Sequence, residues 1–400
     1  MGRWELQIHI SEFLSSCFCD LFGNGGRHDA EYRGGQAGGG ISARQLGLAF
    51  NAVLGIILSL ILAFGAGTIL AGVGVADALM QPARTYLQIV GGFCILNALI
   101  PICSSYLRAF GFSKEPLYAS IIGNVINFCL NAFFLFVLHK GVAGVATATV
   151  VSRIINLVIV VLLGAVLVKA KKHPERESNR EVMGQIIRIG FPSACETAIY
   201  NVSMTLVIRF LNQMDAQGLN VTARSYTMQI TNFSYCVGAA LAQANAIMTG
   251  WHIGAKEYDA CDRGTKKAAV IGVIVAVILE TVFTLCSGWI MQLFSKDPQM
   301  VSLVGKLLAI DIVLEMGRVT NLVYGQALKT SGDAVFPVVM GACFMILCSV
   351  GGTYLFGIRL GLLAVGAYIG MAGDECVRAV GMYLRWKSGK WKEKGLVKSR

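Results

Sequence analysis

The chain has 400 residues, of which 55% are hydrophobic and 14% are charged. A soluble globular domain carries about 25% charged residues, so this composition excludes an ordinary water-soluble protein and also a disordered one. It predicts a polytopic membrane protein, because a bilayer tolerates this much apolar surface outside a core. The net charge of +11 comes from basic residues between long apolar runs rather than in one stripe, which argues against a nucleic-acid partner.

Ten apolar runs are long enough to cross a hydrocarbon layer of about 30 Å, which takes roughly 20 helical residues. Short segments rich in Gly, Asp, Pro or Lys separate these runs. We expect helices, because an isolated strand cannot satisfy its backbone hydrogen bonds in lipid. In chain order the predicted spans are residues 46–73, 86–106, 117–138, 142–168, 186–211, 225–250, 268–294, 301–326, 334–356 and 360–384.

The residue types that carry enzyme chemistry are not arranged for it in this sequence. The 12 cysteines are scattered, and the five histidines lie outside the apolar runs. The sequence shows no phosphate-binding loop in a suitable context, no zinc-ligand spacing and no nucleophile–base set. We therefore expect a protein that is not an enzyme and has no cofactor or resident metal.

The basic residues predict the orientation of the spans. If both termini are cytoplasmic, 23 of the 34 Lys and Arg residues fall in cytoplasmic segments and five fall in outer loops. An excess of this kind marks the cytoplasmic side of a membrane protein. We expect a multi-pass protein of the plasma (inner) membrane with both termini in the cytoplasm. Its basic tail, 386–400, is expected to anchor this topology or to contact lipid headgroups.

The two halves of the chain repeat each other. Gly111 matches Gly332 at an offset of 221 residues, and Gly141 matches Gly361 at an offset of 220. Repeats at a nearly fixed offset indicate two homologous units. Parallel repeats of this kind are an architecture of transporters.

The repeat predicts two helical bundles of unequal size. The first covers 46–168 with four spans, and the second covers 186–385 with six. A basic cytoplasmic linker, 169–185, joins them. Residues 1–45 are rich in glycine and charge, so we expect a poorly ordered or interfacial segment in the place of two spans that the first bundle lacks.

Five segments resemble those of a known family, in order and in spacing. The segments are 40–47 (GISARQLG), 123–131 (GNVINFCLN), 141–146 (GVAGVA), 190–196 (GFPSACE) and 327–333 (ALKTSGD). Together they resemble the multidrug and toxic compound extrusion (MATE) transporters over about residues 36–385. The resemblance implies an all-α, polytopic membrane protein whose ten transmembrane helices match the third to the twelfth span of a twelve-span pattern.

The resemblance also implies a function. It predicts a secondary-active antiporter that exports amphipathic or cationic organic compounds in exchange for H+ or Na+. The expected partners are a small organic substrate, the coupling ion and membrane lipids. Two alternatives stay open: a flippase for lipid-linked substrates, and a truncated remnant that does not transport.

Charged side chains inside the predicted spans mark the candidate ion site, since a charge at mid-bilayer costs at least about 2.5–3.5 kcal/mol. Glu196 lies within the fifth span, and the eighth span carries Asp311, Glu315 and Arg318 at i, i+4, i+7 spacing with Asn321 nearby. In the family, the corresponding two helices supply acidic residues for an ion or proton site. The resemblance therefore implies Glu196, Asp311 and Glu315 as coupling carboxylates, with Na+ as an alternative to H+ near Glu196. The structural alternative is that Glu196 and Glu315 pair with Arg318 and only hold the helices together.

Amide side chains predict where the substrate binds. The third span carries three asparagines at i, i+3, i+7 spacing, and the sixth carries amides among apolar residues. The resemblance places Asn131 where members coupled through the first bundle often have Asp, so an ion site there is expected to be disabled. Hydrogen bonding between helices is the alternative role. The predicted substrate-cavity residues are Asn124, Asn127, Asn131, Gln229, Asn232, Arg318 and Asn321.

Other charged residues in the spans receive no functional role from the sequence. Glu280 and Arg153 each stand alone in their spans, and Asp374, Glu375 and Arg378 are spaced for a local ion pair.

Overall fold

The computed structural model describes residues 37–73, 77–168, 179–214 and 218–394. Within these residues every element is a helix, from α3 to α14, with five short π- or 3-10-helical segments among them. The prediction of an all-α fold is thus confirmed for the described part. The predicted segment 1–45 lies outside the described residues up to residue 36, and the predicted linker lies outside them from 169 to 178.

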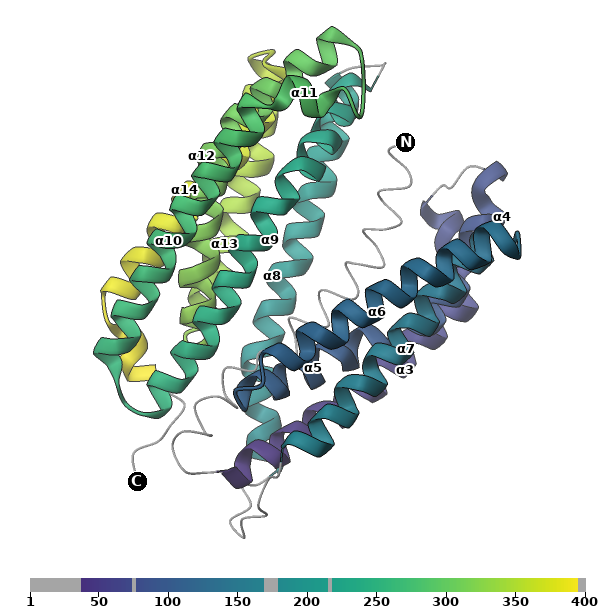
Figure 1. Cartoon of the computed structure of the whole chain (residues 1–400). Helices are drawn as coiled ribbons and strands as arrows, with labels where there is room; N and C mark the ends of the chain where they lie inside the picture. The colour runs from purple at the N-terminus through teal and green to yellow at the C-terminus, as the bar shows by residue number, and fades with distance from the viewer. Residues whose placement is uncertain (1–36, 74–76, 169–178, 215–217, 395–400) are drawn as a thin grey trace. The chain divides into compact units, whose positions relative to one another are not determined.

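The chain forms two compact units, which divide between Gly190 and Phe191. The division falls inside one long helix, α8 (Asn179–Met214). In the first unit α3, α5, α6 and α7 run side by side (Figure 1). Its elements are α3 (Ala37–Val73), α4 (Asp77–Tyr86), η1 (Leu87–Gly91), α5 (Ile95–Ala109), α6 (Lys114–Ala132), η2 (Phe133–Val137) and α7 (Gly141–Leu167).

The predicted span 86–106 is broken in the structure. Its two parts, Met80–Gly91 and Ile95–Arg108, meet at an angle of 40°. The break follows the glycine pair Gly91-Gly92 and the π-helical turn η1, and both features are common causes of sharp kinks in helices. The apolar run therefore predicted the place of this element but not its bend.

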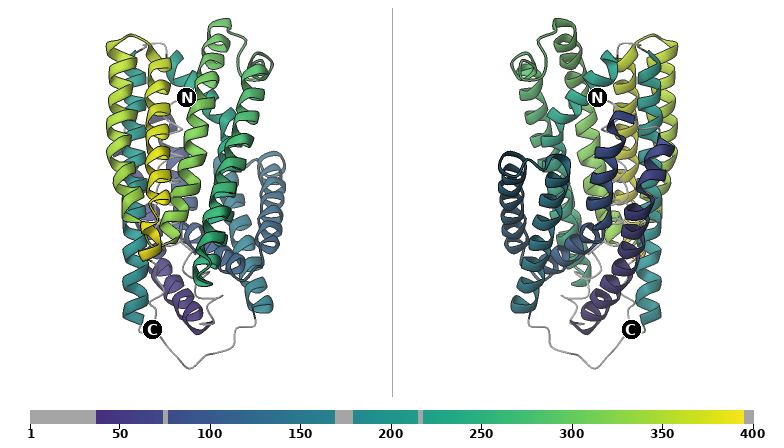
Figure 2. Two further views of the ribbon diagram at one scale, coloured as in Figure 1. Left: turned by 90° about the vertical axis from the view of Figure 1, so that its left-hand side faces the viewer. Right: turned by 90° about the vertical axis from the view of Figure 1, so that its right-hand side faces the viewer.

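The second unit is a bundle around α12 (Pro298–Thr330), which packs against α9, α10 and α14 (Figures 1 and 2). The helix begins after Asp297, whose side chain accepts a hydrogen bond from the backbone N–H of Gln299 at 3.0 Å, with Pro298 at the first helical position. The apolar side chains of α12 that are at most 1% exposed are Val304, Leu307, Leu308, Leu314, Val319, Val323, Ala327 and Leu328. The other elements from α9 onward are α9 (Leu219–Gly254), α10 (Tyr258–Leu285), α11 (Ser287–Met291), α13 (Val335–Phe344), η3 (Met345–Val350), η4 (Thr353–Arg359), α14 (Leu363–Lys387) and η5 (Lys390–Lys394).

The repeat seen in the sequence has a counterpart in the backbone. Gly111 and Gly332 both have a positive φ, of 88° and 92°, just after a helix ends. Gly141 and Gly361 also match, with φ of 54° and 71°, and each follows a π-helical segment, η2 or η4. Glycine is the residue that adopts this left-handed conformation without steric cost, which explains why it recurs at these turns.

Large apolar side chains cover the outside of both units. Phe64 is 85% exposed, Phe128 is 75% exposed and Leu285 is 80% exposed. Such a surface fits a lipid environment, because in water it would lead to association. The structure thus agrees with the composition in describing a membrane protein.

The described residues contain five helices that are long and apolar enough to cross a membrane, or six if the bent pair forms one span. The remaining long helices, α8, α9, α12 and α14, contain most of the buried polar side chains and do not meet the same criterion. The count of ten spans therefore stays a prediction. The five helices are Leu48–Ala71, Lys114–Val137, Gly141–Leu167, Tyr258–Leu285 and Val335–Arg359.

Candidate functional site

Two glycines let α14 approach its neighbours closely. A Cβ atom on Gly317 of α12 would lie 2.8 Å from the backbone nitrogen of Cys376 on α14. A Cβ atom on Gly370 of α14 would lie 2.9 Å from the carbonyl oxygen of Cys348 on η3. Small residues at such contacts are what allows membrane helices to pack backbone to backbone. The close packing brings the polar residues of α12, α14 and η3 into one network.

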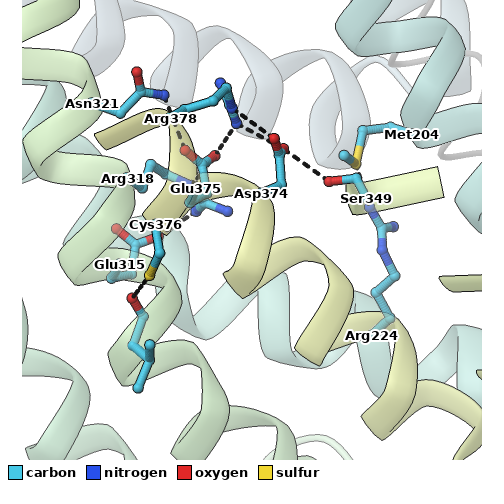
Figure 3. A network of polar contacts seen from close by, with 11 residues as sticks. Met204, Arg224, Glu315, Arg318, Asn321, Ser349, Asp374, Glu375, Cys376 and Arg378 are labelled. Carbon is cyan, nitrogen blue, oxygen red and sulfur yellow. Dashed lines mark hydrogen bonds and ion pairs between the residues drawn. The ribbon is translucent and has the colours of Figure 1, made fainter. Parts of the chain in front are cut away.

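Arg378 holds the first half of this network (Figure 3). Its guanidinium donates to the two oxygens of Asp374, from Nε and Nη2, at 2.9 Å each. Its Nη2 also lies 2.9 Å from Oε1 of Glu375, and Ser349 Oγ donates to Oδ2 of Asp374 at 2.9 Å. All four residues are buried, so these charges are neutralised by each other rather than by water.

Arg318 holds the second half. It forms an ion pair with Glu315, one turn earlier on α12, and its Nε lies 3.5 Å from Oε1 of Glu375. Asn321 Nδ2 donates to Oε2 of Glu375 at 3.1 Å. Glu375 therefore joins the two arginines, and the contact between Glu315 and Arg318 that the sequence offered as a structural alternative is present.

Three carboxylates near this network keep oxygen atoms without a hydrogen-bond partner. Asp311 is 2% exposed and its Oδ2 has no partner, and the same holds for Oε2 of the fully buried Glu315. Glu280 on α10 is fully buried, and neither of its oxygens has a hydrogen bond. Ser234 on α9 is its polar neighbour, and the charges of Asp311 and Glu315 act on it. A buried charge left in this state is costly, because only a proton, a cation or a polar partner can compensate it.

The balance of buried charge in this region is negative. Three guanidinium groups, of the buried Arg224 and Arg378 and of the partly exposed Arg318, stand against five buried carboxylates. The buried carboxylates are Glu280, Asp311, Glu315, Asp374 and Glu375. The buried carboxylates therefore outnumber the guanidinium groups, and additional positive charge would stabilise the arrangement.

Glu196 pairs with a residue that the sequence did not suggest. Its Oε2 lies 2.7 Å from Nζ of Lys329, in the last turn of α12. The two side chains are 18% and 14% exposed, so this pair is not sealed from its surroundings. The suggested partner, Arg318, is instead engaged by Glu315 and by Glu375 of α14.

The asparagines of the first unit are partly brought together. Asn127 Nδ2 donates to Ser152 Oγ of α7 at 3.1 Å, and Asn131 Nδ2 donates to Asn127 Oδ1 at 3.0 Å. Oδ1 of Asn131 is buried without a partner, whereas Asn124 is exposed. The two inner asparagines thus form a neutral polar contact between α6 and α7.

The amides predicted on the sixth span are exposed along α9. Gln229 and Asn232 lie on the outside of the helix, and Tyr235, three residues further, carries its ring 5.9 Å from the guanidinium of Arg318. The structure therefore brings Arg318 and Asn321 into the network and leaves Gln229 and Asn232 outside it.

Sequence reasoning missed several residues of the network. A signal was present for Arg378, since Asp374 and Arg378 are four residues apart and so share a helix face. Glu280 also carried a signal, because a lone carboxylate in an apolar run is costly. Ser349 and Lys329 gave none, because their partners come from helices that are distant in the sequence.

The sequence of this chain is similar to those of known membrane transporters. The family model MatE matches residues 42–133 and 192–355. The uncharacterized transporter YisQ of Bacillus subtilis (strain 168) is 33% identical over 87% of this chain and 77% of its own length. The chain belongs to the MATE family.

Other relatives agree with this assignment. The probable multidrug resistance protein YoeA of the same organism is 22% identical over 88% of the chain and 77% of its own length. The structure of the MATE transporter ClbM in complex with Rb+ superimposes with a TM-score of 0.82 at 16% identity, covering 96% of this chain and 87% of that one. The chain is thus a multi-pass membrane protein with the MATE fold, from a family of multidrug efflux transporters that are not enzymes, as the sequence predicted.

Proposed function

We propose that this MATE protein is a secondary-active antiporter that exports amphipathic or cationic organic compounds in exchange for H+ or Na+. We place it in the plasma membrane with both termini in the cytoplasm. The excess of buried carboxylates around α12 is the observation that carries the proposal. Carboxylates without partners are stable in an apolar bundle only when a positive charge visits them.

The coupling step uses Asp311 and Glu280 as the groups that change charge. When both are neutralised, the three carboxylates of Glu315, Asp374 and Glu375 remain against the three guanidinium groups of Arg224, Arg318 and Arg378. When they are ionised, two negative charges stand in an apolar bundle, and this favours the return of a cation or a change of conformation. One elementary charge that crosses 100 mV is worth about 2.3 kcal/mol, which is enough to drive export against a gradient.

We take H+ as the first candidate for the coupling ion and Na+ as the alternative. A proton needs one oxygen atom, whereas a dehydrated cation needs several ligands at once. The Rb+ complex of ClbM supports a monovalent cation as the second candidate.

The remaining predicted residues receive roles in the same scheme. Glu196 and Lys329 form a second ionic site, which protonation of Glu196 would open. The exposed side chains of Asn124 in the first unit, and of Gln229 and Asn232 in the second, are each proposed to contact the organic substrate. Asn127 and Asn131 are proposed to hold α6 against α7 next to Asn124 through their hydrogen bonds.

A transport assay in proteoliposomes tests the proposal. Efflux of a fluorescent organic cation is followed under a pH gradient and, separately, under a Na+ gradient. We expect Asp311→Asn and Glu280→Gln each to lower pH-driven efflux at least about tenfold, or about 1.4 kcal/mol in the barrier. Asp259→Asn, which removes an exposed carboxylate at the start of α10, is the matched control and should leave efflux unchanged.

Size-exclusion chromatography of each variant separates a transport defect from a folding defect. If well-folded Asp311→Asn and Glu280→Gln variants export at the rate of the parent protein, the proposed coupling site is wrong. If efflux responds only to Na+, the preference for H+ is wrong and the site is kept.

A further inference from the structure

The chain after α14 folds back onto the bundle. Gly389 adopts a φ of 71°, and the short helix η5 begins at the next residue. Trp391 of η5 is 1% exposed and stacks on Trp386 of α14, with ring centroids 4.2 Å apart and an interplanar angle of 9°. Its Nε1 donates to the carbonyl oxygen of Trp386 at 3.0 Å. The tail is therefore part of the bundle as far as η5.

Trp386 also connects the tail to the first turns of α10. Trp386 Nε1 donates to Oδ1 of Asp262 at 2.9 Å, and Lys266 Nζ donates to Oδ2 of the same carboxylate at 2.7 Å. Tyr258, at the first position of α10, packs its ring edge-on against Trp391 with centroids 5.9 Å apart. Asp262 thus links a buried tryptophan of α14 to an exposed lysine of α10.

We call the contacts among Trp386, Trp391 and Asp262 the tail joint, and basic side chains surround this joint. Lys392 lies with Nζ 5.7 Å from the centroid of the Trp391 ring, and its charge acts on Asp262. The same segments carry three exposed acidic residues, Glu257, Asp259 and Glu393, and Glu257 is paired with His252 at 2.9 Å. The exposed basic residues of η5, of the end of α14 and of the region from Lys256 to the second turn of α10 are Lys256, Arg263, Lys266, Lys267, Lys387, Lys390 and Lys392.

Exposed apolar side chains adjoin the basic ones on both helices. On α10, Val270 and Ile271 follow the lysine pair and are 59% and 54% exposed. On α14, Leu384 precedes the basic end and is 56% exposed. A basic surface that continues into a lipid-facing apolar surface matches an anionic amphiphile, with phosphate at one end and acyl chains at the other.

We infer that this joint is a binding site for the headgroup of an anionic phospholipid of the surrounding membrane. A basic tail that only sets the membrane orientation needs charge but no fixed position. Here Trp391 and Asp262 fix η5, the end of α14 and the start of α10 against each other, so the lysines of these elements start from fixed backbone positions. Lysines that extend from two such fixed elements can approach one phosphate from two sides, which the lysines of a loose tail do not do.

The test measures lipid binding by the full-length protein in uncharged detergent micelles. Fluorescent phosphatidylglycerol is titrated, with phosphatidylcholine and inorganic phosphate as competitors. A lysine near an anionic lipid contributes about 1 kcal/mol, so the triple variant K266Q/K390Q/K392Q should bind phosphatidylglycerol about a hundredfold more weakly. The triple variant K140Q/K296Q/K306Q removes the same charge from exposed lysines elsewhere and should keep the affinity of the parent protein.

Several outcomes would overturn the inference. Equal weakening in both triple variants would show a response to net charge alone, and strong competition by phosphatidylcholine would show binding through acyl chains alone. Full competition by inorganic phosphate would assign the site to a soluble anion. Trp391→Ala gives an independent check, because it keeps every lysine: affinity should fall at least about tenfold, and an unchanged value would show that the fixed geometry is irrelevant.

Discussion

The two units place a polar bridge at the same point and give it different chemistry. In the first unit, Asn127 of α6 bonds to Ser152 of α7, 25 residues further along the chain. In the second unit, Ser349 of η3 bonds to Asp374 of α14, also 25 residues further. The two bridges are 222 residues apart, close to the offset of the sequence repeat. The first is neutral, whereas the second continues into a charged network through Arg378.

This difference separates what the fold requires from what the function requires. A duplicated bundle needs its last two helices joined, and a neutral hydrogen bond does this at a low cost of desolvation. Buried ion pairs are not needed for stability, because apolar residues of similar volume often do as well. The fold therefore does not require the buried charges of the second unit, and these charges call for a functional explanation.

The largest effect on stability is expected from Arg378→Met. The variant leaves Asp374 buried without its guanidinium, and a buried pair that loses one partner costs about 3–5 kcal/mol. The matched control is Arg153→Met on α7, a half-buried arginine without an ion pair among the described residues. Denaturant titration of the two purified variants in detergent measures both free energies of unfolding. Similar losses of unfolding free energy in the two variants would show that the buried ion pairs do not distinguish the second unit from the first.

Gly317→Ala tests the close approach that builds the charged network. The added Cβ would lie 2.8 Å from the backbone of α14, so α12 and α14 must move apart, at a cost of about 1–3 kcal/mol. Gly373→Ala on α14 is the control, since its Cβ meets nothing within 4 Å and should be neutral or stabilising by about 0.5–1 kcal/mol. Thermal unfolding of both variants checks the sign. A stabilised Gly317→Ala variant would contradict the packing described here.

Glu196→Gln should lower pH-driven efflux about tenfold, or about 1.4 kcal/mol, because an amide cannot exchange a proton or pair with Lys329. The control is Lys306→Gln, which changes an exposed lysine of α12, the helix that carries Lys329. This variant should leave efflux unchanged. The two rates are compared in proteoliposomes at the same protein density. Equal rates in Glu196→Gln and the parent protein would remove this residue from the coupling scheme.

The sequence predicted the fold better than the site, for a physical reason. The apolar runs, the short segments between them and the repeated glycines are local signals, and the structure places helices and turns where they indicate. The environment of Glu280 depends on Ser234, Asp311 and Glu315, which come from two other helices. Such contacts depend on tertiary packing, so the sequence alone showed the charge but not its neighbours.

The smallest effect is expected from the serines of the two bridges, where the same residue type can be changed in both units. Ser152→Ala removes the hydrogen bond from the neutral amide of Asn127, and such bonds in membrane proteins average about 0.6 kcal/mol. It also removes the local bond from Ser152 Oγ to the carbonyl oxygen of Thr149 on its own helix. Ser349→Ala removes a bond to the Asp374 carboxylate, and bonds to charged groups contribute about 1.5–3 kcal/mol. Both serines are buried and helical, so the change in helix propensity largely cancels between the two variants. We expect the loss of unfolding free energy in Ser349→Ala to be at least twice that in Ser152→Ala. Equal losses would mean that Asp374 is neutral in the bundle, and the charged network would then carry one positive charge more than this structure indicates.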